Sequence, residues 1–183
     1  MGCIVCRTPE RTGICVEHET FMEKTFVVSQ RTGALEALIN GLKFYNNKAA
    51  AQACAELLNE SLPTLPSNTT IVVVPTVPSH IRQRGYDHVD LIARQFAAMR
   101  GLTVKYLLKR VTNDVQHLVG RKERRTQASK AFQLVETDDM PTGPLLLIDD
   151  IITTASTVTA ASKLLSQTGL LVWVAALAYQ PLD

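Results

Sequence analysis

Apolar runs at three places in the chain predict strands that are buried on both faces. The runs are TIVVVP (70–75), GPLLLID (143–149) and LLVWVAALAY (170–179), and shorter stretches at 25–30 and 104–111 predict two further strands. Each long run is rich in Val, Leu or Ile and is bounded by proline, glycine or polar residues. Runs of this kind are typical of strands in the middle of a parallel sheet.

Between these runs, apolar residues recur at the spacing of one helix face. Leu35, Leu38, Ile39 and Leu42 show this spacing most clearly. Helices are expected over the ranges 32–45, 48–62, 87–100 and 156–169. Strands that are apolar on both faces and alternate with helices indicate an α/β fold, in which a mainly parallel sheet is flanked by helices.

Two segments are expected at the ligand-binding edge of this sheet. In open parallel sheets, ligands bind beyond the carboxyl ends of the strands. The segment 74–88 (VPTVPSHIRQRGYDH) follows one predicted strand, and the segment 149–157 (DDIITTAST) follows another. These two segments therefore hold the candidate site residues.

The second segment joins an acidic pair to a loop of hydroxyl side chains. Asp149 and Asp150 end the apolar run. The small residues that lead from them into the next helix are Thr153, Thr154, Ala155, Ser156 and Thr157. Backbone amides at a helix start bind phosphate readily, whereas carboxylates accept hydrogen bonds from ribose hydroxyls or approach Mg²⁺. The combination favours a sugar phosphate that carries a second anionic group.

Two other interpretations of this segment explain less of it. Helix capping needs one Thr, Ser or Asp side chain, so it explains one or two of these residues but not an acidic pair with four hydroxyls. An apolar run that ends in acidic residues is also typical of a Walker B strand, which works with a Walker A loop containing Gly-Lys. The dipeptide Gly-Lys does not occur in the sequence, which argues against an NTPase.

The N-terminus carries two closely spaced pairs of metal-binding side chains. Cys3 and Cys6 form a C-x2-C pair, and Cys15 and His18 form a C-x2-H pair. Two such pairs supply the tetrahedral ligand set of a structural zinc site. The alternative is three free thiols and one surface histidine. We expect a zinc knuckle over residues 1–20, followed by the α/β domain over residues 21–183.

The composition is that of a globular domain with a slight excess of positive charge. Of 183 residues, 46% are hydrophobic and 20% are charged, and the net charge of +2 suits an anionic ligand without requiring nucleic acid. No apolar run approaches the roughly 20 residues that span a bilayer, and the N-terminus lacks the apolar core of a signal peptide. We therefore expect a cytoplasmic protein without membrane insertion, whose cysteines stay reduced. Cys54 lies in a helical pattern and is expected in the core.

The motifs described so far resemble those of a known protein class. The segment LLLIDDIITTAST (145–157) resembles the phosphoribosyl pyrophosphate (PRPP) motif of type I phosphoribosyltransferases, which has four apolar residues, two acids, two apolar residues and a loop rich in Thr and Gly. More narrowly, nearly the full length of the chain resembles the ComF/GntX family of late-competence proteins. An N-terminal zinc knuckle is typical of that family.

Three further segments are similar to motifs of the ComF/GntX family. ALINGLKFYNNK is similar to its helix with a Lys-Tyr or Lys-Phe pair, here Lys43 and Phe44. The segment 84–88 (RGYDH) is similar to its Arg-Gly-Phe-Asn-Gln motif. The segment 116–132 is similar to its Gln…Arg…Asn…Phe loop.

The resemblance implies a type I phosphoribosyltransferase fold for residues 21–183 and a role for each part of the PRPP motif. Asp149 and Asp150 would contact the ribose hydroxyls and, indirectly, Mg²⁺. Residues 153–157 would hold the 5′-phosphate. Thr76 and Val77 would face the pyrophosphate.

Basic residues are the implied partners of the leaving pyrophosphate. Arg124 lies in the basic segment 121–130 and would act as a catalytic residue when this loop closes over the site. Such closure excludes water and brings positive charge to the leaving group. Independently of the resemblance, Arg82 and Arg84 could bind pyrophosphate or a nucleic-acid backbone; the alternative is a solvated basic turn, because arginines are normally exposed.

Four positions depart from the family's pattern. Ala155 stands where the loop usually has glycine, and a Cβ hinders the close approach of a phosphate. Gln127 replaces an asparagine, and Asp87-His88 replaces Asn-Gln. His88 is expected to be a polar surface group rather than a catalytic base.

Two functions follow from the resemblance. The first is a phosphoribosyltransferase that binds Mg·PRPP and transfers the phosphoribosyl group to an unidentified acceptor. The second is a non-catalytic accessory protein of natural competence and DNA uptake, which binds single-stranded DNA and a competence helicase. We expect a role in competence with PRPP binding as the biochemical activity, and the residues leave turnover open.

Overall fold

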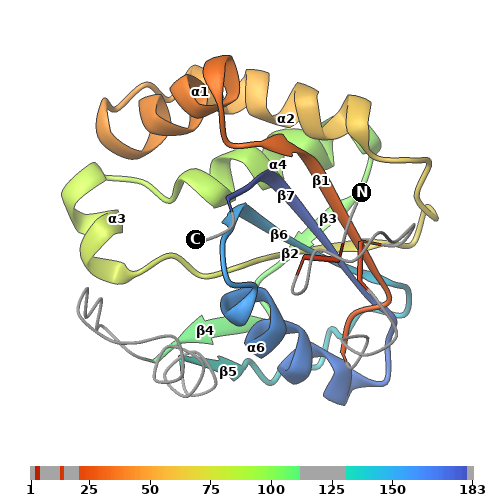
Figure 1. Cartoon of the computed structure of the whole chain (residues 1–183). Coiled ribbons are helices and arrows are strands. Elements are labelled where there is room, and N and C mark those ends of the chain that lie inside the picture. Colours follow the sequence, from red (N-terminus) through yellow and green to blue (C-terminus); the bar gives the residue numbers. More distant parts are fainter. Residues whose placement is uncertain (1–2, 5–12, 15–20, 112–130, 181–183) are drawn as a thin grey trace.

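A five-stranded parallel sheet forms the centre of the computed structural model, which describes residues 3–4, 13–14, 21–111 and 131–180 (Figure 1). Neighbouring strands run parallel in the order β1-β7-β6-β2-β3. The strands are β1 (Lys24–Gln30), β7 (Val172–Tyr179), β6 (Leu145–Ile152), β2 (Thr70–Val73) and β3 (Thr103–Lys105). The three central strands, β7, β6 and β2, are the three apolar runs of the sequence.

Two layers cover the faces of the sheet (Figure 1). One layer consists of the helices α1 (Gly33–Phe44), α2 (Ala50–Ser61) and α4 (His88–Arg100). The other layer consists of α6 (Ser156–Leu165), the 3-10 turn η1 (Ser166–Thr168) and an antiparallel ribbon of β4 (Leu108–Arg110) and β5 (Phe132–Leu134). The predicted α/β class, with a mainly parallel sheet flanked by helices, is confirmed.

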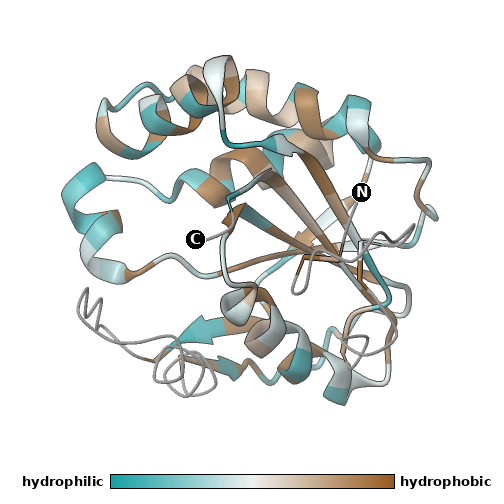
Figure 2. Ribbon diagram, viewed as in Figure 1, coloured by the Kyte–Doolittle hydropathy of each residue, from teal (hydrophilic) through white to brown (hydrophobic). Residues whose placement is uncertain are grey.

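Side chains of the central strands alternate between two hydrophobic cores. In β6, Leu146 and Ile148 pack under the three-helix layer, whereas Leu145 and Leu147 pack against the layer that contains α6. Figure 2 shows these strands mainly in the brown of hydrophobic residues, whereas the helices that flank them mix hydrophobic and hydrophilic residues. Because both faces of each central strand are buried, no polar residue interrupts the apolar runs until the carboxyl ends of the strands.

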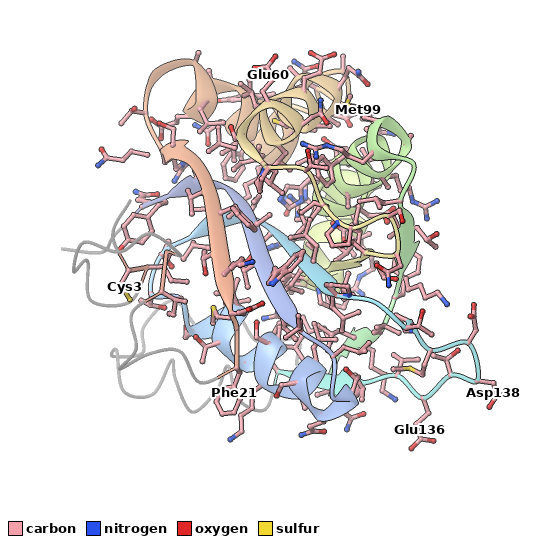
Figure 3. The ribbon with its side chains drawn as sticks, turned by 90° about the vertical axis from the view of Figure 1, so that its right-hand side faces the viewer. Cys3, Phe21, Glu60, Met99, Glu136 and Asp138 are labelled. Atoms are coloured by element: carbon pink, nitrogen blue, oxygen red, sulfur yellow. The ribbon has the colours of Figure 1, made fainter. Side chains whose placement is uncertain are left out.

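The stretch 104–111 forms two strands, and the prediction of a single strand is wrong. β3 pairs with β2 in the main sheet, whereas β4 pairs with β5 in the ribbon. Leu107 and Leu108 both pack in the core under α6. Neighbouring residues of a regular strand point to opposite faces, so the chain must bend to bury both side chains in one core. Figure 3 shows the chain continuing beyond β5 to Glu136 and Asp138 on the outside of the molecule.

The connection from β2 to α4 contains a helix that the hydrophobic pattern does not predict. This helix, α3 (Pro78–Arg84), has proline in its first turn and ends at Gly85, whose φ of 78° lies in the left-handed region that favours glycine. None of its residues is buried, so no apolar periodicity marks it in the sequence. It lies beyond the carboxyl end of β2, where the candidate site was expected.

Several predicted site residues lie outside the described ranges, namely Cys6, Cys15, His18, Arg124 and the whole segment 121–130. Cys3 is described, and it is buried in the core that also contains residues of α6. The zinc knuckle and the catalytic arginine therefore stay predictions. Within the described ranges, no helix has both the length and the apolar character needed to cross a bilayer.

Candidate functional site

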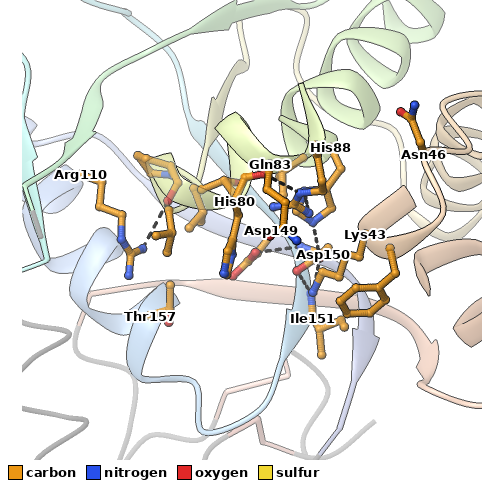
Figure 4. A pocket seen from close by; sticks show the side chains of 17 residues that line it. Lys43, Asn46, His80, Gln83, His88, Arg110, Asp149, Asp150, Ile151 and Thr157 are labelled. Atoms are coloured by element: carbon orange, nitrogen blue, oxygen red, sulfur yellow. Dashed lines mark hydrogen bonds and ion pairs between the residues drawn. The ribbon is translucent and has the colours of Figure 1, made fainter. Parts of the chain in front are cut away.

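A cavity of about 710 Å³ opens at the carboxyl edge of the sheet (Figure 4). Its walls come from α1, α3, α4, β4, β6 and the start of α6, so segments distant in sequence meet there. Its polar lining side chains are Lys43, Asn46, Thr76, His80, Gln83, Arg84, His88, Arg110, Asp149, Asp150 and Thr157. Both segments that the sequence places at the ligand edge thus contribute to one cavity.

The acidic pair lies within β6 rather than in the loop after it, because β6 continues to Ile152. Successive side chains of a strand point to opposite faces of the sheet. Ile148 lies in the core under the three-helix layer and Leu147 lies in the other core, so Asp150 continues the first row and Asp149 continues the second. The two adjacent carboxylates therefore enter different environments.

Asp150 is surrounded by hydrogen-bond donors from the protein. Its Oδ2 lies 2.6 Å from Lys43 Nζ and 2.6 Å from His88 Nε2, and its Oδ1 accepts a hydrogen bond from the backbone N–H of Ile151 at 2.7 Å. Burial alone would raise the pKa of Asp150, but the positive charge of Lys43 and the hydrogen bond from His88 hold this pKa well below its usual range. Asp150 is therefore ionised, and both of its oxygens are occupied by protein donors.

Asp149 has a different environment. It lines the cavity and is partly exposed, and its Oδ1 accepts a hydrogen bond from the backbone N–H of Asp150 at 2.9 Å. Among the described residues, no lysine or arginine nitrogen lies within ion-pair distance of it. Burial raises the pKa of Asp149 to about 8, and the negative charge of Asp150 adds to the increase. At neutral pH the pair therefore carries mainly one negative charge, which resides on Asp150.

Arg110 contributes a positive charge to the wall of the same cavity. Its guanidinium lies 5.1 Å from the ring centre of Phe132, and one terminal nitrogen donates to the carbonyl oxygen of Pro75 at 3.3 Å. Its Nε is buried without a hydrogen-bond partner among the described residues. Burial lowers the pKa of Arg110, while the charge of Asp149 opposes this change. An unsatisfied N–H on a buried cation indicates a place for an anionic or hydrogen-bond-accepting group.

The segment 84–88 connects the elements around the cavity. Tyr86 donates its hydroxyl hydrogen to the carbonyl oxygen of Leu42 in α1 at 2.6 Å. Asp87 caps the N-terminus of α4 by accepting from the backbone N–H of Val89 at 3.0 Å, and it also accepts from the hydroxyl of Thr76 at 2.8 Å. Gly85 ends α3, and Asp87 begins α4 two residues later. The motif thus fixes the angle between the two helices and ties both to α1.

The structure brings together only part of the predicted site. The predicted residues that line the cavity are Thr76, Val77, Arg84, Asp149, Asp150 and Thr157. Thr153, Thr154, Ala155 and Ser156 form the turn before and at the start of α6, and they are not among the lining residues. The hydroxyl oxygens of Thr154 and Ser156 lie 2.7 Å apart, so one of these hydroxyls donates its hydrogen to the other.

Ala155 adopts the conformation that a glycine would favour. Its φ of 57° is left-handed, and it precedes the first residue of α6. Non-glycine residues adopt this region at an energetic disadvantage of about 1–2 kcal/mol, because the Cβ approaches the following carbonyl. At this position the backbone therefore has a conformation that glycine would adopt without this disadvantage.

Sequence reasoning missed some of the side chains that define the cavity. His88 is 3% exposed and bonded to Asp150, so the expectation that it is a surface group is wrong. Lys43 was singled out only by the resemblance, and Arg110 was not singled out at all. No helical periodicity marks His88 in the sequence, because Gly85 ends α3 between Arg84 and His88 and their contact arises only in the folded chain.

Comparison with known proteins gives similarity over most of the chain. No family model matches it. Competence protein F of Haemophilus influenzae is 29% identical over 169 residues, which cover 87% of this chain and 74% of the relative. DNA utilization protein YhgH of Salmonella typhi is 28% identical over 167 residues, which cover 86% and 72%, respectively. Among solved structures, an adenine phosphoribosyltransferase aligns with a TM-score of 0.44 and 13% identity, covering 78% of this chain and 84% of that chain.

Proposed function

We propose that the chain is a member of the ComF family, that it binds Mg·PRPP or a closely related phosphorylated ribose, and that it acts in natural competence and DNA uptake. Its similarity to competence protein F and DNA utilization protein YhgH supports this role. The ligand occupies the cavity at the carboxyl edge of the sheet. Asp149 accepts hydrogen bonds from the ribose hydroxyls, and Arg110 faces the anionic groups.

The observation that carries this proposal is the difference between the two adjacent carboxylates. Asp150 is occupied by Lys43 and His88, each at 2.6 Å. Asp149 lines the cavity without a cationic partner in ion-pair range among the described residues. A carboxylate that is desolvated but unpaired gains most from a ligand that brings hydroxyl donors or a hydrated cation.

Arg110 supports the anionic half of the ligand. A guanidinium binds phosphate oxygens through paired, charge-assisted hydrogen bonds. The Nε of Arg110 is buried and has no partner among the described residues, and its charge lies in the same cavity as Asp149. A cavity with an available acid and an available cation suits a ligand that carries both hydroxyls and phosphates.

The remaining parts of the cavity fit the same ligand. Thr157 lines the cavity in the first turn of α6, where backbone N–H groups favour a phosphate. Mg²⁺ is usually bound by one or two carboxylates together with substrate phosphates and water, so it needs no cage of protein ligands. Asp149 would supply the protein's carboxylate, and the bound ion would compensate the charge of the pyrophosphate.

The test is a calorimetric titration of the full chain with Mg·PRPP. The wild type, Asp149→Asn and the control Asp139→Asn are compared. Asp139 pairs with Lys105 and has a side chain that is 89% exposed, so the same chemical change there leaves the cavity intact. We expect saturable binding by the wild type and the control, and an affinity at least about tenfold lower for Asp149→Asn, since charged hydrogen bonds contribute roughly 1.5–3 kcal/mol.

Absence of binding by the wild type contradicts the proposal. Equal affinity of all three proteins for Mg·PRPP would contradict the proposed contact between Asp149 and the ligand. Thermal unfolding of each variant, followed by circular dichroism, separates loss of the site from loss of the fold.

Ala155 favours a second candidate, in which the ligand is bound without turnover. Its Cβ stands at the start of α6, where a glycine backbone would allow closer approach of a phosphate. In this candidate the protein is an accessory factor of DNA uptake that binds single-stranded DNA and a competence helicase. Pyrophosphate release from Mg·PRPP with any nucleobase, abolished by Asp149→Asn, rules this candidate out. Binding of single-stranded DNA that survives Asp149→Asn supports it.

We further propose a structural zinc ion held by Cys3, Cys6, Cys15 and His18. The support is their paired spacing in the sequence and the chemistry of three thiolates with one imidazole. Of the four, the structure describes Cys3, which is buried. Metal analysis of the purified full chain is expected to give one zinc per molecule, and Cys6→Ser is expected to lose it. A metal content near zero in the wild type contradicts the site.

A further inference from the structure

A chain of side chains links α3 to the acidic strand through His88. One terminal nitrogen of Arg84 lies 3.0 Å from His88 Nδ1, and His88 Nε2 lies 2.6 Å from Asp150 Oδ2. Arg84 also donates through Nε to the carbonyl oxygen of His80 at 3.1 Å, which fixes its guanidinium at the end of α3. Lys43 of α1 reaches the same oxygen of Asp150 at 2.6 Å. Four elements of the fold therefore meet at one buried imidazole–carboxylate contact.

The partners of His88 determine which ring nitrogen carries the hydrogen. A guanidinium has only donors, so the contact with Arg84 requires an unprotonated, accepting Nδ1. An ionised carboxylate only accepts, so the contact with Asp150 requires a hydrogen on Nε2. The neutral Nε2–H tautomer is the one form of the ring that satisfies both contacts. His88 is 3% exposed, so water cannot readily replace either partner.

We propose that His88 is a positioning residue, which Arg84 holds in the neutral Nε2–H tautomer so that the imidazole fixes the Asp150 carboxylate. With Asp150 fixed by His88 and Lys43, the neighbouring Asp149 is directed into the cavity. Arg84 then acts on the acidic pair through His88. The position of α3 thereby influences the orientation of the Asp150 carboxylate in β6. The effect on ligand affinity rests on the proposed binding of Mg·PRPP, whereas the tautomer and the coupling do not.

This proposal changes the role of Arg84. The sequence suggests that Arg84 binds pyrophosphate or a nucleic-acid backbone directly, but two of its nitrogens are already directed at His80 and His88. It differs from Arg110, whose Nε lacks a partner among the described residues. A purely structural role of His88 predicts only a change in stability. The positioning role predicts in addition a specific ring tautomer and a dependence of Arg84 on His88.

The first test observes the ring directly by long-range ¹H–¹⁵N correlation spectroscopy of the labelled full chain. The sequence has four histidines, and loss of one signal set in His88→Gln assigns the ring. At neutral pH we expect a pyridine-type Nδ1 and a pyrrole-type Nε2. A hydrogen on Nδ1, or on both nitrogens, overturns the proposal.

The coupling to α3 is tested with Arg84→Met and the matched control Arg82→Met, which changes an exposed arginine on the same helix. Loss of the donor in Arg84→Met is expected to shift the Nδ1 resonance toward the position of an unbonded ring nitrogen. The control is expected to leave it unchanged. An unchanged Nδ1 resonance in Arg84→Met overturns the link between Arg84 and His88.

The second test measures the affinity for Mg·PRPP in His88→Leu, His88→Gln, Arg84→Met and the double variant Arg84→Met/His88→Leu. Partners that orient a ligating group typically change affinity by about 10–100-fold, so we expect such a loss for His88→Leu. His88→Gln keeps a donor for Asp150 and is expected to bind more tightly than His88→Leu. The double variant is expected to bind no more weakly than His88→Leu, since Arg84 acts through the imidazole.

Multiplicative losses in the double variant would mean that Arg84 acts on the ligand independently, and they overturn the relay. If the wild type does not bind Mg·PRPP, the proposed function fails, and the spectroscopic test still decides the tautomer and the coupling. Each variant is checked for cooperative unfolding. Because Arg84 is only partly buried, Arg84→Met is expected to fold even if the His88 variants do not, and it then still tests the link between Arg84 and His88.

Discussion

Replacing Asp149 by asparagine should make the protein more stable at neutral pH, although it removes a central residue of the candidate site. Asparagine keeps the shape of the side chain and an oxygen that accepts from the backbone N–H of Asp150, a bond of 2.9 Å in the wild type. It removes only the ability to ionise. The variant therefore measures the disadvantage of placing a carboxylate at this position.

The magnitude follows from the pKa of Asp149, which burial raises from an ordinary value of 3.8 to about 8. Between these two values, the folded state holds a proton that the unfolded state releases. The contribution of Asp149 is therefore fully favourable below the unfolded value and is lost as the pH rises through the folded one. One proton corresponds to about 1.4 kcal/mol per pH unit, so the advantage of the asparagine variant should grow by at most about 3 kcal/mol between pH 5 and pH 7.

The assay is urea unfolding of the wild type, Asp149→Asn and Asp139→Asn at several pH values between 5 and 8. Subtracting the free energies of unfolding removes the contributions of all groups that the proteins share. Asp150 does not interfere, because its pKa is lowered and its contribution is lost only as the pH falls toward and below the ordinary value of 3.8. The difference between Asp139→Asn and the wild type should stay constant over this range.

A flat difference between Asp149→Asn and the wild type would refute the reasoning, since it would mean that Asp149 is ionised in the folded protein throughout. A difference that falls with increasing pH would have the wrong sign and could not come from Asp149, because a carboxyl group with a lowered pKa is ionised in both the folded and the unfolded state above pH 5. A slope near half the stated limit would still support the argument, because water in the cavity reduces the desolvation of a partly exposed carboxyl group.

Three further substitutions test the other charges and the loop. Arg110→Met should change the free energy of unfolding by less than about 1 kcal/mol, because removal of the unpartnered Nε offsets loss of the contacts with Pro75 and Phe132, yet it should weaken Mg·PRPP binding at least about tenfold in calorimetry. Lys43→Met should destabilise the fold by about 2–4 kcal/mol in urea unfolding, because Asp150 loses a cation at 2.6 Å; the exposed Lys109→Met serves as control. Ala155→Gly should change stability by less than about 1 kcal/mol, since relief of the left-handed φ is offset by the greater freedom of glycine in the unfolded chain, while Mg·PRPP binding becomes tighter.

The sequence predicts the central sheet well because burial there is symmetrical. Each of β2, β6 and β7 packs against a core on both faces, so an uninterrupted apolar run in the sequence directly predicts a central strand. The acidic pair stands out for the same reason, since Asp149 and Asp150 are the first charges in such a run. The carboxyl edge of the sheet could thus be located from the sequence alone.

The environment of each carboxylate could not be predicted in the same way. His88 and Asp150 are 62 residues apart, and their contact depends on how α4 packs against β6. The local sequence around His88, RQRGYDH, is polar and is typical of an exposed turn. Arg110 is similar, because its partners Pro75 and Phe132 lie in other segments and its strand has three residues. Short elements with polar sequences carry little periodic signal, although they form most of the cavity wall.

Two neighbouring acids at the end of a buried strand are tolerated because their side chains point to opposite faces of the sheet and enter different environments. The pleat directs Asp150 toward Lys43 and His88, where it is a stable anion, and directs Asp149 into the cavity, where burial favours the protonated form. A ligand with hydroxyl donors or Mg²⁺ would favour the ionised form of Asp149, so binding below pH 8 should release a proton. Calorimetry at pH 6.5 in buffers with different ionisation enthalpies measures this release directly. Release of close to one proton per ligand by the wild type, absent in Asp149→Asn, would show that ligand binding ionises Asp149. Absence of proton release in the wild type would contradict this.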